Sequence, residues 1–87
     1  MIWSWRSKRL SNLDMYKNVF VEAFGVSLSD VEELKYDEIE EWDSVGHMRM
    51  IALLEEKFNI ELEIDDVFNY QSFKNGKIIL KKYNVSL

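Results

Sequence analysis

The chain contains no cysteine and one histidine, so a disulfide, a thiolate metal site or a histidine-based metal centre is not expected. It also contains no proline, which favours helices because proline removes a backbone donor and clashes with the preceding turn. No apolar run reaches the roughly 18 residues that a membrane span requires, so stable membrane insertion is not expected. The N-terminus lacks the apolar core of a secretory signal, which predicts a cytoplasmic protein.

What is present indicates one small globular domain. The 87 residues, 47% of them hydrophobic, leave room for one core and little room for a catalytic cleft. The formal net charge is -5, and acidic residues crowd the stretch 30–43, where Lys35 is the one basic residue. An acidic body disfavours nucleic acid as a partner and favours a basic protein surface, although solubility alone also explains it.

Residues 1–10 differ from the rest because they carry tryptophan and basic side chains and no acid. A segment this short does not fold alone. We predict a loosely packed N-terminal tail here, with contact to a partner or to membrane headgroups as the alternatives. Residues 11–87 are predicted to form the domain.

The first helix is predicted over about Asn12 to Phe24, with Ser11 or Asn12 as its cap, Asp14 in its first turn and Gly25 as its stop. Its apolar face consists of Leu13, Tyr16, Val19, Phe20, Ala23 and Phe24.

An acidic connection follows over about residues 26–42. Within it, Ser29 and Asp30 are suited to start a short helical turn, with Val31 and Leu34 pointing inward. Long connections are uncommon in compact domains and tend to be functional.

A second helix is predicted from near Ser44 to near Phe58, with Asn59 as its stop. Residues 60–64 read as an extended link, because no second convincing strand exists for them to pair with. The apolar stripe of this helix consists of Val45, Met48, Ile51, Ala52, Leu54 and Phe58, and the link offers Ile60, Leu62 or Ile64 as core anchors.

A short helix is predicted over about Asp65 to Tyr70, capped by Asp65 and anchored by Val67 and Phe68. The last helix is predicted from Ser72, as its cap, to about Tyr83; Phe73, Ile79, Leu80 and Tyr83 form its apolar side. Asn75-Gly76 is also a strong hairpin signal, but an isolated hairpin here would be marginal. The predicted fold is all-α, a small helical bundle of three longer helices plus one short helix.

The second predicted helix contains the motif that points to a chemical function. It starts with Asp43-Ser44-Val45 and ends with Leu54-Glu55-Glu56-Lys57-Phe58. Together with Ile64-Asp65-Asp66-Val67-Phe68 and Ser72-Phe73, this layout resembles the acyl carrier protein family over about residues 13–83. The resemblance implies a stand-alone carrier that is not itself an enzyme and has no catalytic residue.

The resemblance gives Ser44 a defined role. A separate phosphopantetheinyl transferase would attach 4'-phosphopantetheine from coenzyme A to the Ser44 hydroxyl. Acyl groups would then be bound to the terminal thiol as thioesters. Asp43 resembles the residue that helps to engage the transferase and its magnesium. A helix N-terminus also offers free amide donors and partial positive charge to an anionic phosphodiester.

The residues of this segment allow two other interpretations. Asp43 and Ser44 are also good capping residues, and capping is compatible with modification. His47 lies three residues after Ser44, so a serine nucleophile with a histidine base is conceivable, but the chain has no second histidine and no oxyanion-forming glycine loop. His47 is instead expected to be exposed and to contact partner enzymes.

The chain departs from the fatty-acid synthesis branch of the family, which has acidic residues on the exposed face of this helix after the serine. Here Gly46, His47 and Arg49 occupy those places, while Glu55 and Glu56 remain acidic. The departure implies a specialised carrier for a dedicated pathway. The residues expected to contact partner enzymes are Val45, His47, Met48, Arg49, Glu55 and Glu56. Gly76 stands where the last helix of the family has an apolar core residue.

The expected partners are the transferase, a loading ligase or acyltransferase, and downstream pathway enzymes, all acting on a monomer. Large aromatic side chains in the predicted core suggest short or polar acyl cargo, or cargo left in solvent. An aminoacyl or peptidyl carrier is the alternative within the class, although Glu41-Trp42 replaces the glycine pair that usually precedes its serine. A helical interaction module without a prosthetic group is the alternative from another class.

Overall fold

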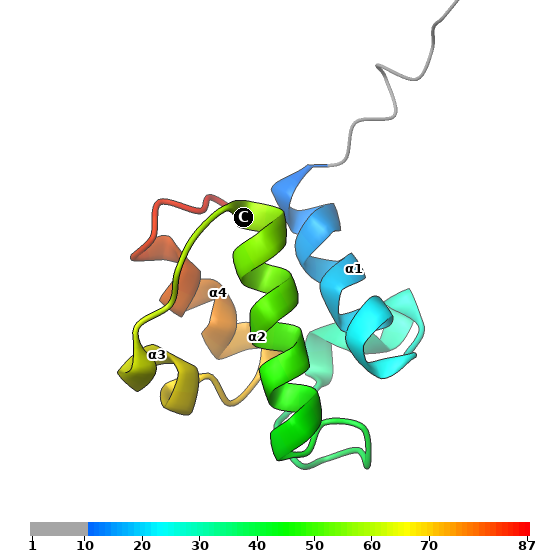
Figure 1. The fold of residues 1–87 in the computed structure, drawn as a ribbon. Coiled ribbons are helices and arrows are strands. Elements are labelled where there is room, and N and C mark those ends of the chain that lie inside the picture. Colours follow the sequence, from blue (N-terminus) through cyan, green and yellow to red (C-terminus); the bar gives the residue numbers. More distant parts are fainter. Residues whose placement is uncertain (1–10) are drawn as a thin grey trace, which may run out of the picture.

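The computed structural model describes residues 11–87, and its secondary structure is helical (Figure 1). The elements are α1 (Asn12–Phe24), the 3₁₀ helix η2 (Leu28–Glu33), α2 (Ser44–Phe58), α3 (Ile64–Asn69) and α4 (Phe73–Lys81). The predicted all-α bundle with three longer helices and one short helix is therefore confirmed. No helix between residues 11 and 87 has both the length and the apolar character needed to cross a bilayer. The predicted tail 1–10 lies outside the described residues.

The first helix begins and ends where its sequence signals predict. The Ser11 hydroxyl accepts a hydrogen bond from the Asp14 amide at 3.1 Å, which caps α1. Gly25 ends the helix at φ 72°, and its amide donates to the Val21 carbonyl at 2.8 Å. A left-handed residue at this point favours glycine because a Cβ atom would be strained there.

Aromatic side chains fill the core between α1, the loop before α2 and the start of α4. The Trp42 ring stacks on Phe24 with centroids 5.0 Å apart, and Phe20 meets Phe73 edge to face at 5.2 Å. The predicted inward positions Val31 and Leu34 in and after η2 are both buried. Because aromatic rings occupy this space, the interior is packed rather than open.

The predicted apolar stripe of α2 is partly wrong. Ile51 and Leu54 are buried as predicted, but Val45, Met48 and Ala52 are exposed. The buried face follows Gly46, His47, Met50, Ile51 and Leu54 instead. This buried face begins with a glycine and a histidine, which are not counted as apolar residues. A prediction from apolar residues alone therefore placed the buried face on the wrong side of the first turn of α2.

The short helix α3 also differs from its prediction. It begins at Ile64 after Glu63, which makes no side-chain capping bond, so Asp65 is not the cap. Val67 is buried, whereas Phe68 is 70% exposed and is not a core anchor. A helix of six residues presents one side to the body, and here that side carries Asp66 and Val67. Of the link residues, Leu62 is the buried anchor, while Ile64 is exposed.

The last helix is a helix and not a hairpin. The Ser72 hydroxyl accepts from the Asn75 amide at 2.9 Å, and the Asn75 side chain accepts from the Ser72 amide at 2.7 Å, which completes a capping box. This reciprocal cap explains why Asn75-Gly76 continues a helix here. Lys35 and Ser72 form an isolated antiparallel bridge that ties the acidic loop to the start of α4.

Gly76 has a packing reason that the sequence does not show. A Cβ atom at Gly76 would lie 2.2 Å from Cζ of Tyr70 and 2.3 Å from the Tyr16 hydroxyl. These two residues form a buried two-tyrosine pair, in which Tyr70 donates to Tyr16 at 2.6 Å and Tyr16 donates to the Phe73 carbonyl at 2.7 Å. The missing apolar side chain of α4 is thus replaced by two phenol rings from other segments.

Candidate functional site

The site is built on the first turn of α2. Asp43 is the N-cap residue, and its carboxylate accepts from the Gly46 amide at 2.8 Å, while its carbonyl accepts from the His47 amide at 2.7 Å. The amides of Ser44 and Val45 therefore remain without an intrahelical acceptor. They and the helix dipole favour an anion at this position.

The Ser44 side chain is exposed on this turn, and its hydroxyl makes no hydrogen bond to residues 11–87. Other serines are engaged: Ser27 donates to Asp30 at 2.9 Å, Ser29 lies 3.3 Å from Ser27, and Ser72 caps α4. An accessible primary hydroxyl beside two free amides fits a covalent phosphodiester, because the oxygen can be esterified without breaking an internal bond.

Gly46 lets the acidic loop approach the helix closely. A Cβ atom at this position would lie 1.9 Å from the Glu41 carbonyl oxygen and 3.3 Å from the Phe24 ring. Backbone on one side and a buried ring on the other leave no direction in which a side chain could be placed. The loop that ends in Trp42 and Asp43 is thereby held against the first turn.

His47 is buried, so the expectation of an exposed partner contact is wrong. It is 7% exposed and forms the Trp42–His47 pair: the Trp42 indole N–H donates to Nδ1 at 2.9 Å, and the two ring planes lie within 16° of each other. Because indole is a donor only, Nδ1 is the unprotonated nitrogen, and Nε2–H donates to the Val67 carbonyl at 2.8 Å. His47 therefore joins the loop, α2 and α3.

A surface hollow of about 330 Å³ opens beside the serine, between α2 and α3. Met48 and Phe68, both more than half exposed, lie on its rim, and the buried His47 lies in its wall. The lining residues are Tyr36, Ser44, His47, Met48, Val67, Phe68 and Gln71. Phe68, which the sequence assigned to the core, is thus exposed at the site, as is Met48, which the sequence assigned both to the apolar stripe and to the partner contacts.

The other predicted contact residues lie along the outer face of α2. Val45 is 70% exposed, and Arg49 and Glu56 are exposed as well. Glu55 is half-buried, and its carboxylate accepts from the Leu62 amide at 2.9 Å, so it anchors the link after α2. Glu56 lies about 18 Å along the helix from Ser44, since an α-helix rises 1.5 Å per residue.

An ionic cluster anchors α3 on its other side. The Asp66 carboxylate accepts from Lys82 Nζ at 2.6 Å and from the Tyr83 hydroxyl. The hydrogen bond from Lys82 is the main reason that the pKa of Asp66 is lowered, and the same bond raises the pKa of Lys82. Burial, followed by the Asp66 bond, raises the pKa of the Tyr83 phenol. The wall of the hollow is therefore fixed at both His47 and Asp66.

Trp42 is the part of the site that the sequence interpretation missed. It is fully buried, and it lies directly before Asp43 at the end of a loop rich in acidic residues. A large aromatic residue isolated among acids is a signal for an anchor, since burying such a ring is strongly favourable. Its hydrogen bond to His47 could not be read from sequence, because it depends on how the loop returns to α2.

Comparison with known proteins agrees with this geometry. The family model described as the phosphopantetheine attachment site matches residues 17–75, which is more than half of the chain and includes the first turn of α2. No curated protein and no solved structure matches the chain. Domains of this family are the site at which 4'-phosphopantetheine is attached covalently. The chain therefore belongs to the phosphopantetheine attachment family and is a carrier protein of that family.

Proposed function

We propose that Ser44 bears the 4'-phosphopantetheine and that the chain carries acyl groups on it as thioesters. The observation that carries the proposal is the free, exposed Ser44 hydroxyl at the N-terminus of α2, inside the range matched by the family model. The attached arm supplies a terminal thiol, which a chain without cysteine cannot provide itself.

The residues around Ser44 hold and present the group rather than activate the hydroxyl. A separate transferase forms the bond between Ser44 Oγ and phosphorus, the nucleotide part of coenzyme A leaves, and the hydroxyl proton passes to the transferase or to water. The free amides of Ser44 and Val45 would offer hydrogen-bond donors to the negative phosphodiester. Asp43 fixes this turn and presents a carboxylate for transferase and magnesium recognition.

The function as a serine enzyme has no support in this arrangement. His47 accepts from Trp42 through one ring nitrogen and donates to the Val67 carbonyl through the other. Neither nitrogen is free to take a proton from Ser44, and a general base must be within hydrogen-bond reach of its proton. We therefore propose that the chain is a carrier and not an enzyme.

The partner surface is proposed to be the exposed face of α2 after Ser44. It offers the apolar Val45 and Met48 first, then the basic Arg49, and the acidic Glu56 near the helix end. This face of mixed charge would be recognised by a transferase, by a loading ligase or acyltransferase, and by pathway enzymes. Since partner choice depends on matching charge, Arg49 supports a dedicated pathway over bulk fatty-acid synthesis.

Short acyl cargo fits the site best. The aromatic core leaves the hollow of about 330 Å³ beside Ser44 as the space nearest to the arm, and exposed Met48 and Phe68 give it an apolar rim. Native mass spectrometry and thioester hydrolysis of acetyl, butyryl, octanoyl and aminoacyl forms would rank the cargoes. Protection of the short acyl forms supports the proposal, and selective loading of an amino acid by the natural ligase would favour the aminoacyl carrier.

The decisive test of attachment is intact mass after incubation with coenzyme A, magnesium and a promiscuous phosphopantetheinyl transferase. We expect one phosphopantetheine on the native chain and on Ser29→Ala, a matched control at another exposed serine, and none on Ser44→Ala. Modification of Ser44→Ala would refute the assignment of the residue. If the folded native chain stays unmodified with the promiscuous transferase and with its own transferase, the result would favour the interaction module without a prosthetic group. Residues 11–87 as the carrier domain, a monomer and a cytoplasmic location remain predictions.

A further inference from the structure

Tyr36 has a hydroxyl that makes no hydrogen bond to any of residues 11–87. The other three tyrosine hydroxyls, those of Tyr16, Tyr70 and Tyr83, are all hydrogen-bonded. In the described part of the chain every buried side-chain polar atom has a partner, so the unpaired Tyr36 hydroxyl is open to the outside. A phenol hydroxyl can donate one hydrogen bond, so this donor is available to a ligand.

The ring of Tyr36 is held in place although its hydroxyl is free. The Tyr36 amide donates to the Gln71 carbonyl at 2.8 Å, which ties the acidic loop to the residues before α4. The Tyr36 ring meets the His47 ring edge to face at 5.4 Å and the Trp42 ring at 6.4 Å. Because its side chain is already fixed, Tyr36 would lose little conformational freedom on binding a ligand.

Tyr36 and Ser44 line the same hollow of about 330 Å³. Met48 and Phe68, both more than half exposed, give this hollow an apolar rim. The Gln71 side chain donates to the Phe68 carbonyl at 2.8 Å, which helps to fix that rim. The hollow thus combines a free polar donor with exposed apolar side chains, and this composition is typical of small-ligand sites.

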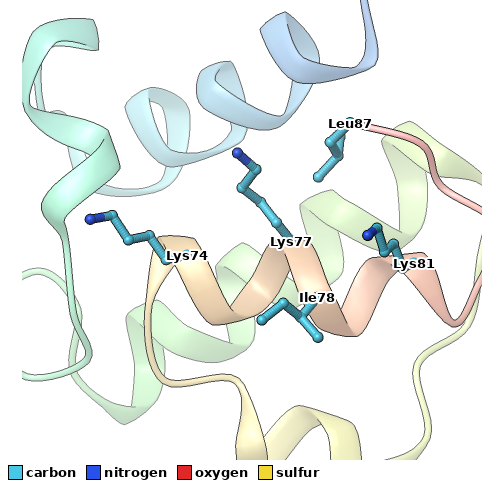
Figure 2. Close-up of a pocket in the computed structure, with 5 residues that line it drawn as sticks. All are labelled: Lys74, Lys77, Ile78, Lys81 and Leu87. Carbon is cyan, nitrogen blue, oxygen red and sulfur yellow. The ribbon is translucent and has the colours of Figure 1, made fainter.

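A larger hollow of about 500 Å³ lies over α4 (Figure 2). Three lysines, Ile78 and Leu87 line it, and Figure 2 shows the lysines spread along α4 with Leu87 beside the helix. It has no lining residue in common with the hollow beside Ser44. A group attached to Ser44 therefore starts in the smaller hollow, and Ile78 offers an internal control for contacts elsewhere.

The phosphopantetheine arm has the chemistry that the smaller hollow would take. Its first part after the phosphate, the pantoyl group, has two methyl groups on one carbon, followed by a hydroxyl and an amide carbonyl. The methyl groups match the apolar rim of Met48 and Phe68. The free amides of Ser44 and Val45 are available to the phosphate, which leaves the pantoyl carbonyl as the first carbonyl acceptor for the Tyr36 hydroxyl.

We propose that Tyr36 is a positioning residue that donates to the pantoyl carbonyl and holds the root of the arm in this hollow. This role of Tyr36 rests on the proposed attachment at Ser44. An arm held here is presented in one direction to partner enzymes. It also leaves little of the hollow for cargo, which agrees with short acyl groups. Without the contact to Tyr36, the arm would move freely in solvent.

The test is NMR spectroscopy of the full chain carrying an isotope-labelled arm, attached by the promiscuous transferase from labelled coenzyme A. In the native chain we expect nuclear Overhauser contacts from the pantoyl methyl groups to Met48 and Phe68 and none to Ile78. We also expect the pantoyl carbonyl signal to be shifted from its position in free coenzyme A. Tyr36→Phe keeps the ring and removes only the hydroxyl, so it should keep the native stability, lose the carbonyl shift and weaken the methyl contacts.

Tyr16→Phe is the matched control, because it removes a phenol hydroxyl from the core and not from the hollow. It should lower the stability of the fold and leave the arm signals unchanged. This pattern is the opposite of that expected for Tyr36→Phe. Equal changes of the arm signals in the two variants would overturn the proposal, because they would trace the effect to the fold.

Intact mass, measured before the spectra, separates the positioning role from attachment itself. A native chain that gains no mass, or a Ser44→Ala chain that gains as much, would overturn both. A modified native chain whose arm signals equal those of free coenzyme A would overturn the positioning role alone. Arm signals that are the same in Tyr36→Phe and in the native chain would do so as well.

Discussion

The two-tyrosine pair in the core and the Trp42–His47 pair beside the site are both chains of two hydrogen bonds that end on a backbone carbonyl. They differ in what surrounds them. Burial raises the pKa of the phenols of Tyr16 and Tyr70, so both remain donors over the physiological range. The imidazole, in contrast, accepts from Trp42 only while Nδ1 carries no proton. The core pair therefore keeps both of its phenol donors, whereas the site pair consists of an indole donor and an imidazole that accepts through one nitrogen and donates through the other.

The pairs also differ in what they join. The two-tyrosine pair connects α1 with the segment around the start of α4, deep in the packed interior. The Trp42–His47 pair connects α2 with α3, and α3 forms one wall of the open hollow. The first pair therefore lies within the core of the fold, while the second holds the α3 wall of the hollow beside Ser44.

The largest expected effect comes from crowding the core pair. Gly76→Ala places a methyl group about 2.2 Å from a buried ring that cannot turn away. Overpacking of this kind destabilises by about 1–3 kcal/mol, and the upper end is expected here because two rings must move. Urea unfolding of the unmodified protein measures the change, and phosphopantetheine attachment should continue in the folded fraction.

Gly46→Ala is the matched change at the site. Its methyl group would meet the Glu41 carbonyl, so the loop that carries Trp42 and Asp43 must shift. We expect a comparable loss of stability together with slower attachment at Ser44. Attachment slowed equally by Gly76→Ala and Gly46→Ala would contradict the separation of the two regions.

The core was predictable in part because helix signals are local. Ser11, Gly25 and Asn59 marked the helix ends correctly, since caps and left-handed stops depend on a few neighbouring residues. The two-tyrosine pair was not predictable, because it joins residues 54 positions apart. Gly76 appeared as a defect in the sequence, and only the position of Tyr16 and Tyr70 shows why it fits.

At the candidate site, the sequence correctly placed Asp43 and Ser44 at the start of α2 but misplaced the residues around them. His47 was assigned to the surface because its position corresponds to the exposed acidic face of the fatty-acid synthesis branch, yet two hydrogen bonds make its burial favourable. Phe68 was assigned to the core because it is apolar, and Met48 was placed on the apolar stripe although it was also expected to contact partners; both lie on the rim of the hollow. Residue type alone cannot separate a buried polar pair from an exposed apolar rim.

The second prediction concerns variants of His47 that remove the Trp42–His47 pair in whole or in part. His47→Leu leaves the Trp42 N–H and the Val67 carbonyl without their partner, and unsatisfied buried groups cost about 1–3 kcal/mol. We expect a loss of about 2 kcal/mol in urea unfolding. His47→Asn keeps an acceptor for Trp42, and His47→Gln keeps a donor for Val67, so each should lose less than His47→Leu. Equal losses for the three variants would argue against two separate hydrogen bonds.

The third prediction compares the two tyrosines of the core pair, which differ in the hydrogen bonds that each one donates and accepts. Tyr16→Phe removes the acceptor of Tyr70 and the donor to the Phe73 carbonyl, whereas Tyr70→Phe leaves the second bond intact. We expect about 1–2 kcal/mol for Tyr16→Phe and a smaller loss for Tyr70→Phe, measured by thermal and urea unfolding. A larger loss for Tyr70→Phe would reverse the assigned donor order.

The fourth prediction separates capping from recognition at Asp43. Asp43→Ala loses the bond to the Gly46 amide and should cost about 1 kcal/mol of stability, whereas Asp43→Asn caps nearly as well. If the carboxylate also serves the transferase, both variants slow attachment, and only Asp43→Ala lowers stability. Normal attachment kinetics of Asp43→Asn would limit Asp43 to a capping role.

The smallest expected effect concerns the second anchor of α3. The pKa of Asp66 is lowered below its ordinary 3.8, mainly by the hydrogen bond from Lys82 and next by that from Tyr83. A carboxyl group with a lowered folded pKa contributes stability above its ordinary value and loses it as the pH falls through the folded value. Lys82, whose pKa is raised from 10.5, contributes stability below that value and loses it as the pH rises through its folded pKa.

Asp66→Asn should therefore be less stable than the native chain at pH 7, and the two stability curves should converge as the pH falls below about 4. Urea unfolding between pH 2 and pH 7 measures the curves, and Asp65→Asn, the exposed neighbour, should keep the native shape. Parallel curves for Asp66→Asn and the native chain would show that the bonds to Lys82 and Tyr83 do not stabilise the folded state. The α3 wall of the hollow would then be held by the His47 bond to the Val67 carbonyl and by the Asn75 bond to the Asn69 carbonyl, without a contribution from Asp66.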